Sequence, residues 1–114
     1  MSDTLIQKPW GTEQIWANTA HYIGKILTIK KACSLSYQFH QIKEETIYVM
    51  EGEIELEFEK DNKKQSIQLN VGDSFHIPPK MKHRMIAVQN CKVIEVSTPH
   101  LDDVVRLEDE YGRV

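Results

Sequence analysis

Four residues whose side chains can bind a divalent cation stand near the ends of predicted strands. Gln38 and His40 are two positions apart in an alternating segment, so both side chains project from the same face. Glu45 follows after a short bend, and His83 lies far downstream. Imidazole and carboxylate groups together bind Fe, Mn, Ni, Co or Zn, and an amide oxygen can complete the ligand set. Such a set would leave coordination positions open for a substrate, so these residues favour a metal site with catalytic capacity.

Short strands separated by turns must position these residues. Apolar and β-branched runs, several of them alternating with polar residues, predict strands over the ranges 22–30, 34–40, 46–50, 53–59, 65–69, 74–77, 83–88 and 92–97. Asp61 and Asn62 form the turn of a hairpin, and the glutamates of 51–59 form a solvated face. This pattern is typical of an all-β sandwich or barrel. The one helical candidate is a single turn within 102–110.

Composition restricts the class of protein. The 114 residues predict one domain spanning 1–114, and a net charge of −3 argues against a general nucleic-acid binder. No apolar run approaches the roughly 20 residues that cross a bilayer, and no signal peptide precedes the first strand. We therefore expect a cytoplasmic protein without membrane contact. Cys33 and Cys91 are expected to be reduced thiols, since they form no metal-type pair.

The candidate ligands belong to two blocks that resemble the two motifs of the cupin superfamily. In chain order, the matching residues are Gln38, His40, Glu45, Gly52, Gly72, Pro78 and His83. The resemblance implies a double-stranded β-helix, or jelly-roll barrel, with a divalent transition metal held by Gln38, His40, Glu45 and His83. Gln38 replaces the usual first histidine and is a weaker ligand. Lys80 and Ala87 stand where a glycine and an asparagine are usual.

Both ends of the chain narrow the resemblance to the type II phosphomannose isomerase family of cupins. The similar segments are Lys8-Pro-Trp-Gly11, Leu35-Ser-Tyr-Gln-Phe-His40, Ile77-Pro-Pro-Lys-Met-Lys-His83-Arg84 and the tail over 102–113. This family implies aldose–ketose isomerisation of a sugar phosphate or related sugar, as in mannose-6-phosphate isomerase. Many relatives carry a fused mannose-1-phosphate guanylyltransferase. We expect no nucleotide-sugar synthesis here, because 114 residues leave no room for that domain and contain no Gly-rich nucleotide loop.

Residue roles follow from the same resemblance. The general base of an isomerase would be Glu45, Lys43 or Glu44, which the sequence does not rank. Guanidinium groups suit phosphate, so the candidates for substrate binding are Arg84, Arg106 and Arg113, with Lys80 and Lys82 as further cations. Arg106 could instead pair internally with Asp102, Asp103 or Glu108. The remaining histidines are expected to be structural or exposed: His21, His76 and His100.

Two other functions stay open. Family histidines beside the metal glutamate are replaced here, by residues that include Gln41 and Thr46, and together with Gln38 this favours a non-catalytic sugar-binding cupin. A cupin dioxygenase using ferrous iron is the third possibility. The resemblance also implies a homodimer formed through edge strands. Trp10 and Trp16 would then either pack across the interface or close the barrel.

Overall fold

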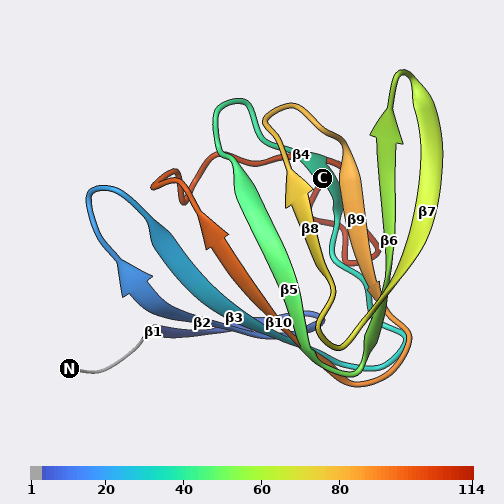
Figure 1. The fold of residues 1–114 in the computed structure, drawn as a ribbon, viewed down its shortest axis with the longest axis horizontal. Coiled ribbons are helices and arrows are strands. Elements are labelled where there is room, and N and C mark those ends of the chain that lie inside the picture. The colour runs from blue at the N-terminus through green and yellow to red at the C-terminus, as the bar shows by residue number, and fades with distance from the viewer. Residues whose placement is uncertain (1–3) are drawn as a thin grey trace.

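Two antiparallel sheets face each other in the computed structural model, which describes residues 4–114 (Figure 1). The six-stranded sheet has the order β1-β2-β3-β10-β5-β8 and the five-stranded sheet the order β11-β4-β9-β6-β7. Their bounds are β1 Thr4–Lys8, β2 Gly11–Asn18, β3 Ile23–Ile29, β4 Tyr37–Phe39, β5 Glu45–Glu51, β6 Glu53–Lys60, β7 Lys63–Asn70, β8 Ser74–Ile77, β9 His83–Ala87, β10 Cys91–Ser97 and β11 Val105–Glu108. Within residues 4–114, no helix has the length and apolar character needed to span a membrane.

The predicted all-β architecture is confirmed, and its strands follow the alternation of the sequence. In β6, Ile54, Leu56 and Phe58 are buried between the sheets, whereas the intervening glutamates are half-buried on the outer face. Asp61 and Asn62 have φ values of 55° and 60°. A two-residue hairpin turn whose twist matches that of the flanking strands requires positive φ at both of its central residues. Lys60 and Lys63 therefore pair directly across the β6–β7 hairpin.

The space between the sheets is filled by one apolar cluster and, beside it, by buried polar groups. The cluster contains Trp10, Leu27, Ile29, Ile47, Val49, Ile54, Leu56, Phe58, Leu69, Ile77, Met85, Ala87, Cys91 and Val93. The buried charged and histidine side chains are Lys25, His40, Lys43, Glu45, His83 and Glu95. Buried charges are costly unless they are paired or bind a ligand, so this polar region marks a site.

The N-terminal segment forms two strands that the sequence patterns did not predict. β1 and β2 pair as a hairpin whose turn is Pro9-Trp10, with Lys8 opposite Gly11. Trp10 is buried in the core and closes the barrel, whereas Trp16 is 47% exposed. Gly11 lies so close to β3 that a Cβ atom there would be 1.9 Å from the carbonyl oxygen of Thr28. This contact explains why glycine follows the buried tryptophan.

The helical turn expected within 102–110 is wrong. Residues 105–108 instead form β11, which pairs with β4 and places Arg106 opposite Gln38. The predicted strand over 34–40 is shorter, since only 37–39 form β4 while Ser34 makes an isolated bridge to Ile86. Because β4 is so short, the tail supplies the strand that covers its otherwise open edge.

Candidate metal centre

Three buried side chains bring nitrogen and oxygen atoms together between the sheets. His40 follows β4, His83 begins the neighbouring strand β9, and Glu45 begins β5 in the opposite sheet. One potential ligand atom from each residue lies within 4.8 Å of the others. His40 Nε2 is 2.9 Å and His83 Nε2 is 3.4 Å from Glu45 Oε1. This triad therefore joins the two sheets at one point.

Hydrogen bonding at the far side of each imidazole ring defines the face that the triad turns inward. His40 Nδ1 is 2.5 Å from the carbonyl oxygen of Asp103, and His83 Nδ1 is 2.8 Å from that of Met81. A carbonyl oxygen only accepts, so each Nδ1 donates to the backbone and each ring directs its Nε2 atom at Glu45. His83 Nε2 and Glu45 Oε2 are buried without a hydrogen-bond partner among the described residues. Two ring nitrogens and a carboxylate that converge on one point fit a bound cation, and backbone-anchored imidazoles are typical of metal ligands.

A buried lysine and a second carboxyl group adjoin the triad. Lys43 Nζ is 3.1 Å from Glu95 Oε2 and 3.7 Å from Glu45 Oε2. Burial opposes ionisation of Glu45, but hydrogen bonds from His40 and His83 and the Lys43 ammonium hold the pKa of Glu45 well below its usual range. Burial and the Glu45 charge raise the pKa of Glu95 to about 8. Glu45 is therefore ionised, as a carboxyl group must be to bind a metal.

The loop between β4 and β5 is anchored by one residue of the tail. The Asp103 carboxylate accepts backbone N–H groups of Lys43, Ile42 and Gln41 at 2.8, 2.7 and 3.0 Å. These bonds lower the pKa of Asp103 to about 2. The Asp103 carbonyl oxygen also accepts the hydrogen bond from His40 Nδ1. The tail therefore positions both the His40 ring and the loop that leads to Glu45.

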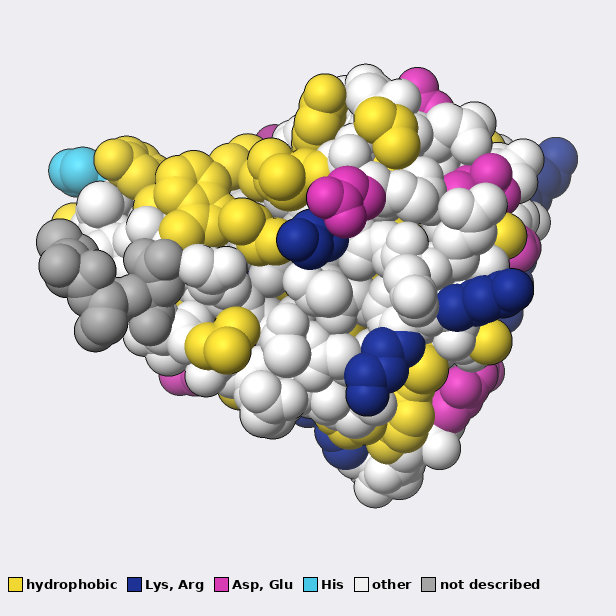
Figure 2. Space-filling model, turned by 90° about the horizontal axis from the view of Figure 1, so that it is seen from below, with side chains coloured by type: hydrophobic (Ala, Val, Ile, Leu, Met, Phe, Trp, Pro, Cys, Tyr) yellow, Lys and Arg dark blue, Asp and Glu magenta, His cyan; other side chains and the backbone are white. Residues whose placement is uncertain are grey.

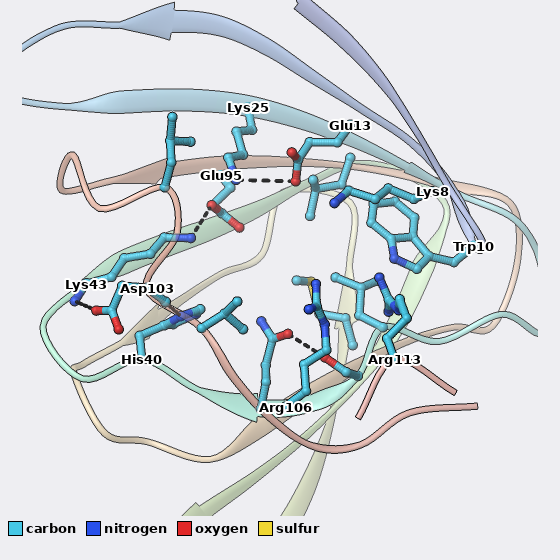
Figure 3. Close-up of a pocket in the computed structure, with 17 residues that line it drawn as sticks. Lys8, Trp10, Glu13, Lys25, His40, Lys43, Glu95, Asp103, Arg106 and Arg113 are labelled. Carbon is cyan, nitrogen blue, oxygen red and sulfur yellow. Dashed lines mark hydrogen bonds and ion pairs between the residues drawn. The ribbon is translucent and has the colours of Figure 1, made fainter. Parts of the chain in front are cut away.

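A cavity of about 110 Å³ opens beside the triad, and His40 is the triad member that lines it (Figure 3). Its charged lining residues are Lys8, Glu13, Lys25, Lys43, Glu95, Asp103, Arg106 and Arg113. Lys25 donates to Glu13 at 3.3 Å, and Lys43 of the β4–β5 loop donates to Glu95 at 3.1 Å, so two paired sets of side chains face the cavity. Charged groups with spare donors and acceptors suit a polar, hydroxyl-rich ligand.

The residues assigned from the sequence do not all lie at this cavity. Gln38, Arg106 and Arg113 line it, and the Gln38 amide oxygen accepts the Ser36 hydroxyl at 2.6 Å. Arg84 is on the outer face instead, where it reaches Glu108 at 3.0 Å. Glu44 is exposed and pairs with His76. The two lysines Lys80 and Lys82 are exposed and outside the cavity lining.

Sequence reasoning missed Glu95, Lys25, Glu13 and Lys8. Lys25 and Glu95 occupy inward positions of strands whose other inward residues are mostly apolar, and they are register partners in β3 and β10. A charged residue at an inward position of an apolar strand is the pattern that could have identified them.

Residues 25–97 match the family model described as the cupin domain. The chain belongs to the cupin family. It is 28% identical over 113 residues to the xanthan biosynthesis protein XanB of Xanthomonas campestris pv. campestris, an alignment that covers 95% of this chain. The chain spans only 23% of the length of that relative.

Solved structures share the cupin's fold at low sequence identity. KdgF from Halomonas sp. has a TM-score of 0.76 at 21% identity, covering 85% of this chain and 88% of KdgF. Oxalate decarboxylase of Bacillus subtilis, described with Mn(II) centres, has a TM-score of 0.81 at 11% identity, covering 98% of this chain and 32% of the enzyme. CapF has a TM-score of 0.73 at 16% identity, covering 95% of this chain and 35% of CapF.

Proposed function

We propose that this cupin is a metal-dependent isomerase that interconverts the aldose and ketose forms of a sugar phosphate or related sugar, as mannose-6-phosphate isomerase does. The observation that carries this proposal is the convergence of two buried imidazole Nε2 atoms on Glu45, beside a cavity lined by ion-paired charged groups. Similarity to XanB, whose name places it in the biosynthesis of xanthan, supports a sugar ligand. The end motifs resembling type II phosphomannose isomerases support the reaction.

His40, Glu45 and His83 would hold the cation, which could be Zn, Mn, Fe, Co or Ni, and Gln38 is the candidate fourth ligand. A bound cation would polarise the two sugar oxygens between which the carbonyl moves. Lys43 and Glu95 face the cavity and touch each other at 3.1 Å, so they present an acid and a base beside the reacting carbons. We therefore keep Lys43 as the catalytic candidate, and Glu45 would act as a ligand of the metal.

The isomerase proposal predicts turnover by the metal-loaded protein. Protein stripped of metal and reloaded with Zn, Mn, Fe, Co or Ni separately should interconvert mannose 6-phosphate and fructose 6-phosphate. Lys43→Met should lower kcat by about 100-fold or more, because it removes a proton-transfer group. The exposed Lys82→Met variant should match the wild type. Absence of turnover across all five metals and a panel of aldose and ketose phosphates would refute the proposal.

A ferrous dioxygenase is the second candidate, because His40, Glu45 and His83 form a set of two histidines and one carboxylate. Such sets hold non-haem iron in oxygenases. Oxygen consumption by the iron-loaded protein on addition of substrate would favour this function over isomerisation. Sugar binding without turnover, seen as thermal stabilisation alone, would favour a non-catalytic cupin.

We also propose that two copies of the chain associate through the outer face of the six-stranded sheet rather than through its edges. The central strands of this sheet carry apolar side chains on their outer face, where polar ones are usual. Ile94 of β10 pairs in register with Ile26 of β3 on one side and Tyr48 of β5 on the other, and Val96 is 46% exposed. Figure 2 shows hydrophobic side chains gathered in a band on one face of the molecule. In contrast, β6 of the other sheet turns glutamates outward. A contiguous apolar sheet face suits a self-complementary dimer.

The dimer proposal predicts a solution mass of twice 13.3 kDa by light scattering. Tyr48→Glu combined with Val96→Glu should reduce the mass to 13.3 kDa, because two buried carboxylates would oppose each other across the interface. Val71→Glu, at an exposed turn position, should leave the dimer intact. A monomeric wild type at about 100 μM, a concentration well above the affinity of specific complexes, would contradict this proposal.

A further inference from the structure

The cavity carries more positive than negative charge, although the protein as a whole is acidic. Five cationic side chains and three carboxyl groups line it, whereas the net charge of the chain is −3. Three of the cations are neutralised. Lys25 pairs with Glu13, Lys43 lies against both Glu95 and the ionised Glu45, and Arg113 donates through Nε and Nη2 to Asp109. The excess positive charge of the cavity lining therefore comes from Lys8 and Arg106.

Neither Lys8 nor Arg106 has a side-chain partner within residues 4–114, and the Nε atom of Arg106 is buried without a hydrogen bond. A buried donor without an acceptor destabilises the protein, and more strongly when the donor is charged. Among the described residues no ion pair joins the Asp103 carboxylate to Lys8 or Arg106, and its oxygens accept three backbone N–H groups instead. Two unpaired cations facing one cavity are explained by an anionic ligand.

The two cations come from opposite sheets and meet at the end of the cavity away from His40. Lys8 ends β1 and Arg106 lies in β11, at the edge strands of the two sheets. In Figure 3 both side chains extend into the cavity from opposite walls beside Trp10, while His40 and Lys43 lie at the other end. Lys8 and Arg106 can therefore hold one group between them.

Strand register sets the separation between this end and the triad. Arg106 pairs with Gln38, and Gln38 pairs with His83, so the three form one row across β11, β4 and β9. Neighbouring strands are about 4.8 Å apart, so roughly 10 Å separates the backbones of Arg106 and His83. A ligand of a few carbon atoms can thus reach the triad with one end and Arg106 with the other.

We propose that Lys8 and Arg106 form a clamp for a phosphate monoester, which binds the end of the ligand that lies farthest from the metal triad. Two unpaired cations match the charge of about −1.5 to −2 that a phosphate monoester carries at neutral pH, whereas a carboxylate carries one charge. Arg113 supports the clamp but is neutralised by Asp109, whose pKa it lowers to about 2. That the clamp holds the phosphate of the substrate rests on the proposed function, whereas its binding of free phosphate does not.

The clamp is tested on protein stripped of metal, by calorimetry with inorganic phosphate, mannose 6-phosphate and mannose. Phosphate and mannose 6-phosphate should bind, and mannose should bind at least tenfold more weakly. Lys8→Met and Arg106→Met should each weaken phosphate binding by about 10-fold to 100-fold, the range expected for a lost charge-assisted hydrogen bond. Arg106→Lys should recover part of the affinity, because it restores the charge without the planar guanidinium.

Lys82→Met is the matched control, because Lys82 is an exposed lysine outside the cavity lining. Its phosphate affinity should equal that of the wild type. The clamp is overturned if the stripped wild type does not bind phosphate, or if folded Lys8→Met and Arg106→Met proteins bind it as the wild type does. Circular dichroism verifies the folding of each variant. Since no turnover is measured, failure of the isomerase assay would leave these results unaffected.

Discussion

Replacement of His83 by alanine is expected to strip the cupin of its metal. The side chain is 1% exposed, its Nε2 lies 3.4 Å from Glu45 Oε1, and no other described residue satisfies that nitrogen. Loss of the outer hydrogen-bond partners of metal ligands alone lowers affinity by about 10–100-fold, so loss of a ligand should exceed about 100-fold. Elemental analysis should find near-stoichiometric transition metal in the wild type and almost none in the variant.

His76→Ala is the control for this experiment. His76 is an exposed histidine of the adjacent strand β8 that pairs with Glu44 rather than with the triad. Its metal content should be unchanged. A chelator should lower the Tm of the wild type and of His76→Ala, because metal binding stabilises the folded state, but should not affect His83→Ala. Metal retained by a folded His83→Ala protein at the wild-type level would show that the triad is not the binding site.

Gly11→Ala should destabilise the fold by about 3 kcal/mol, the upper part of the range for overpacked sites. The added Cβ would lie 1.9 Å from Thr28 O and 3.0 Å from Thr28 C, both backbone atoms near the end of β3. Relief requires the whole β1–β2 hairpin to move, and with it the buried Trp10. In a domain of this size the Tm should fall by roughly 12 °C. Urea unfolding at equilibrium measures the change in free energy.

Gly72→Ala separates this clash from backbone strain. Gly72 has a φ of +92°, which L residues rarely adopt, but a Cβ there would meet no atom within 4 Å. Its cost should be limited to strain of about 1–2 kcal/mol. Equal destabilisation by the two substitutions would mean that the close approach of β2 to β3 is not what restricts position 11 to glycine.

Much of the fold was predictable because local patterns specify it. The alternation of Ile54, Leu56 and Phe58 with glutamates predicts an outward and an inward face, and the Asp61-Asn62 pair predicts the hairpin turn. The N-terminal hairpin was missed, since its residues alternate weakly and Pro9 interrupts them. The helical turn assigned to the tail failed because β11 is stabilised by pairing with β4 rather than by its own sequence.

At the site, the sequence by itself determined the types and spacing of His40, Glu45 and His83, since ligand chemistry depends on those side chains alone. Only the tertiary structure decided which groups surround them. Asp103 anchors a loop 60 positions earlier in the chain, and Glu95 meets Lys43 across 52 positions. Lys8 and Arg106 reach one cavity from opposite sheets, while Arg84 turns outward to Glu108. These contacts depend on strand register and sheet packing, which join residues too distant in sequence for local periodicity to relate.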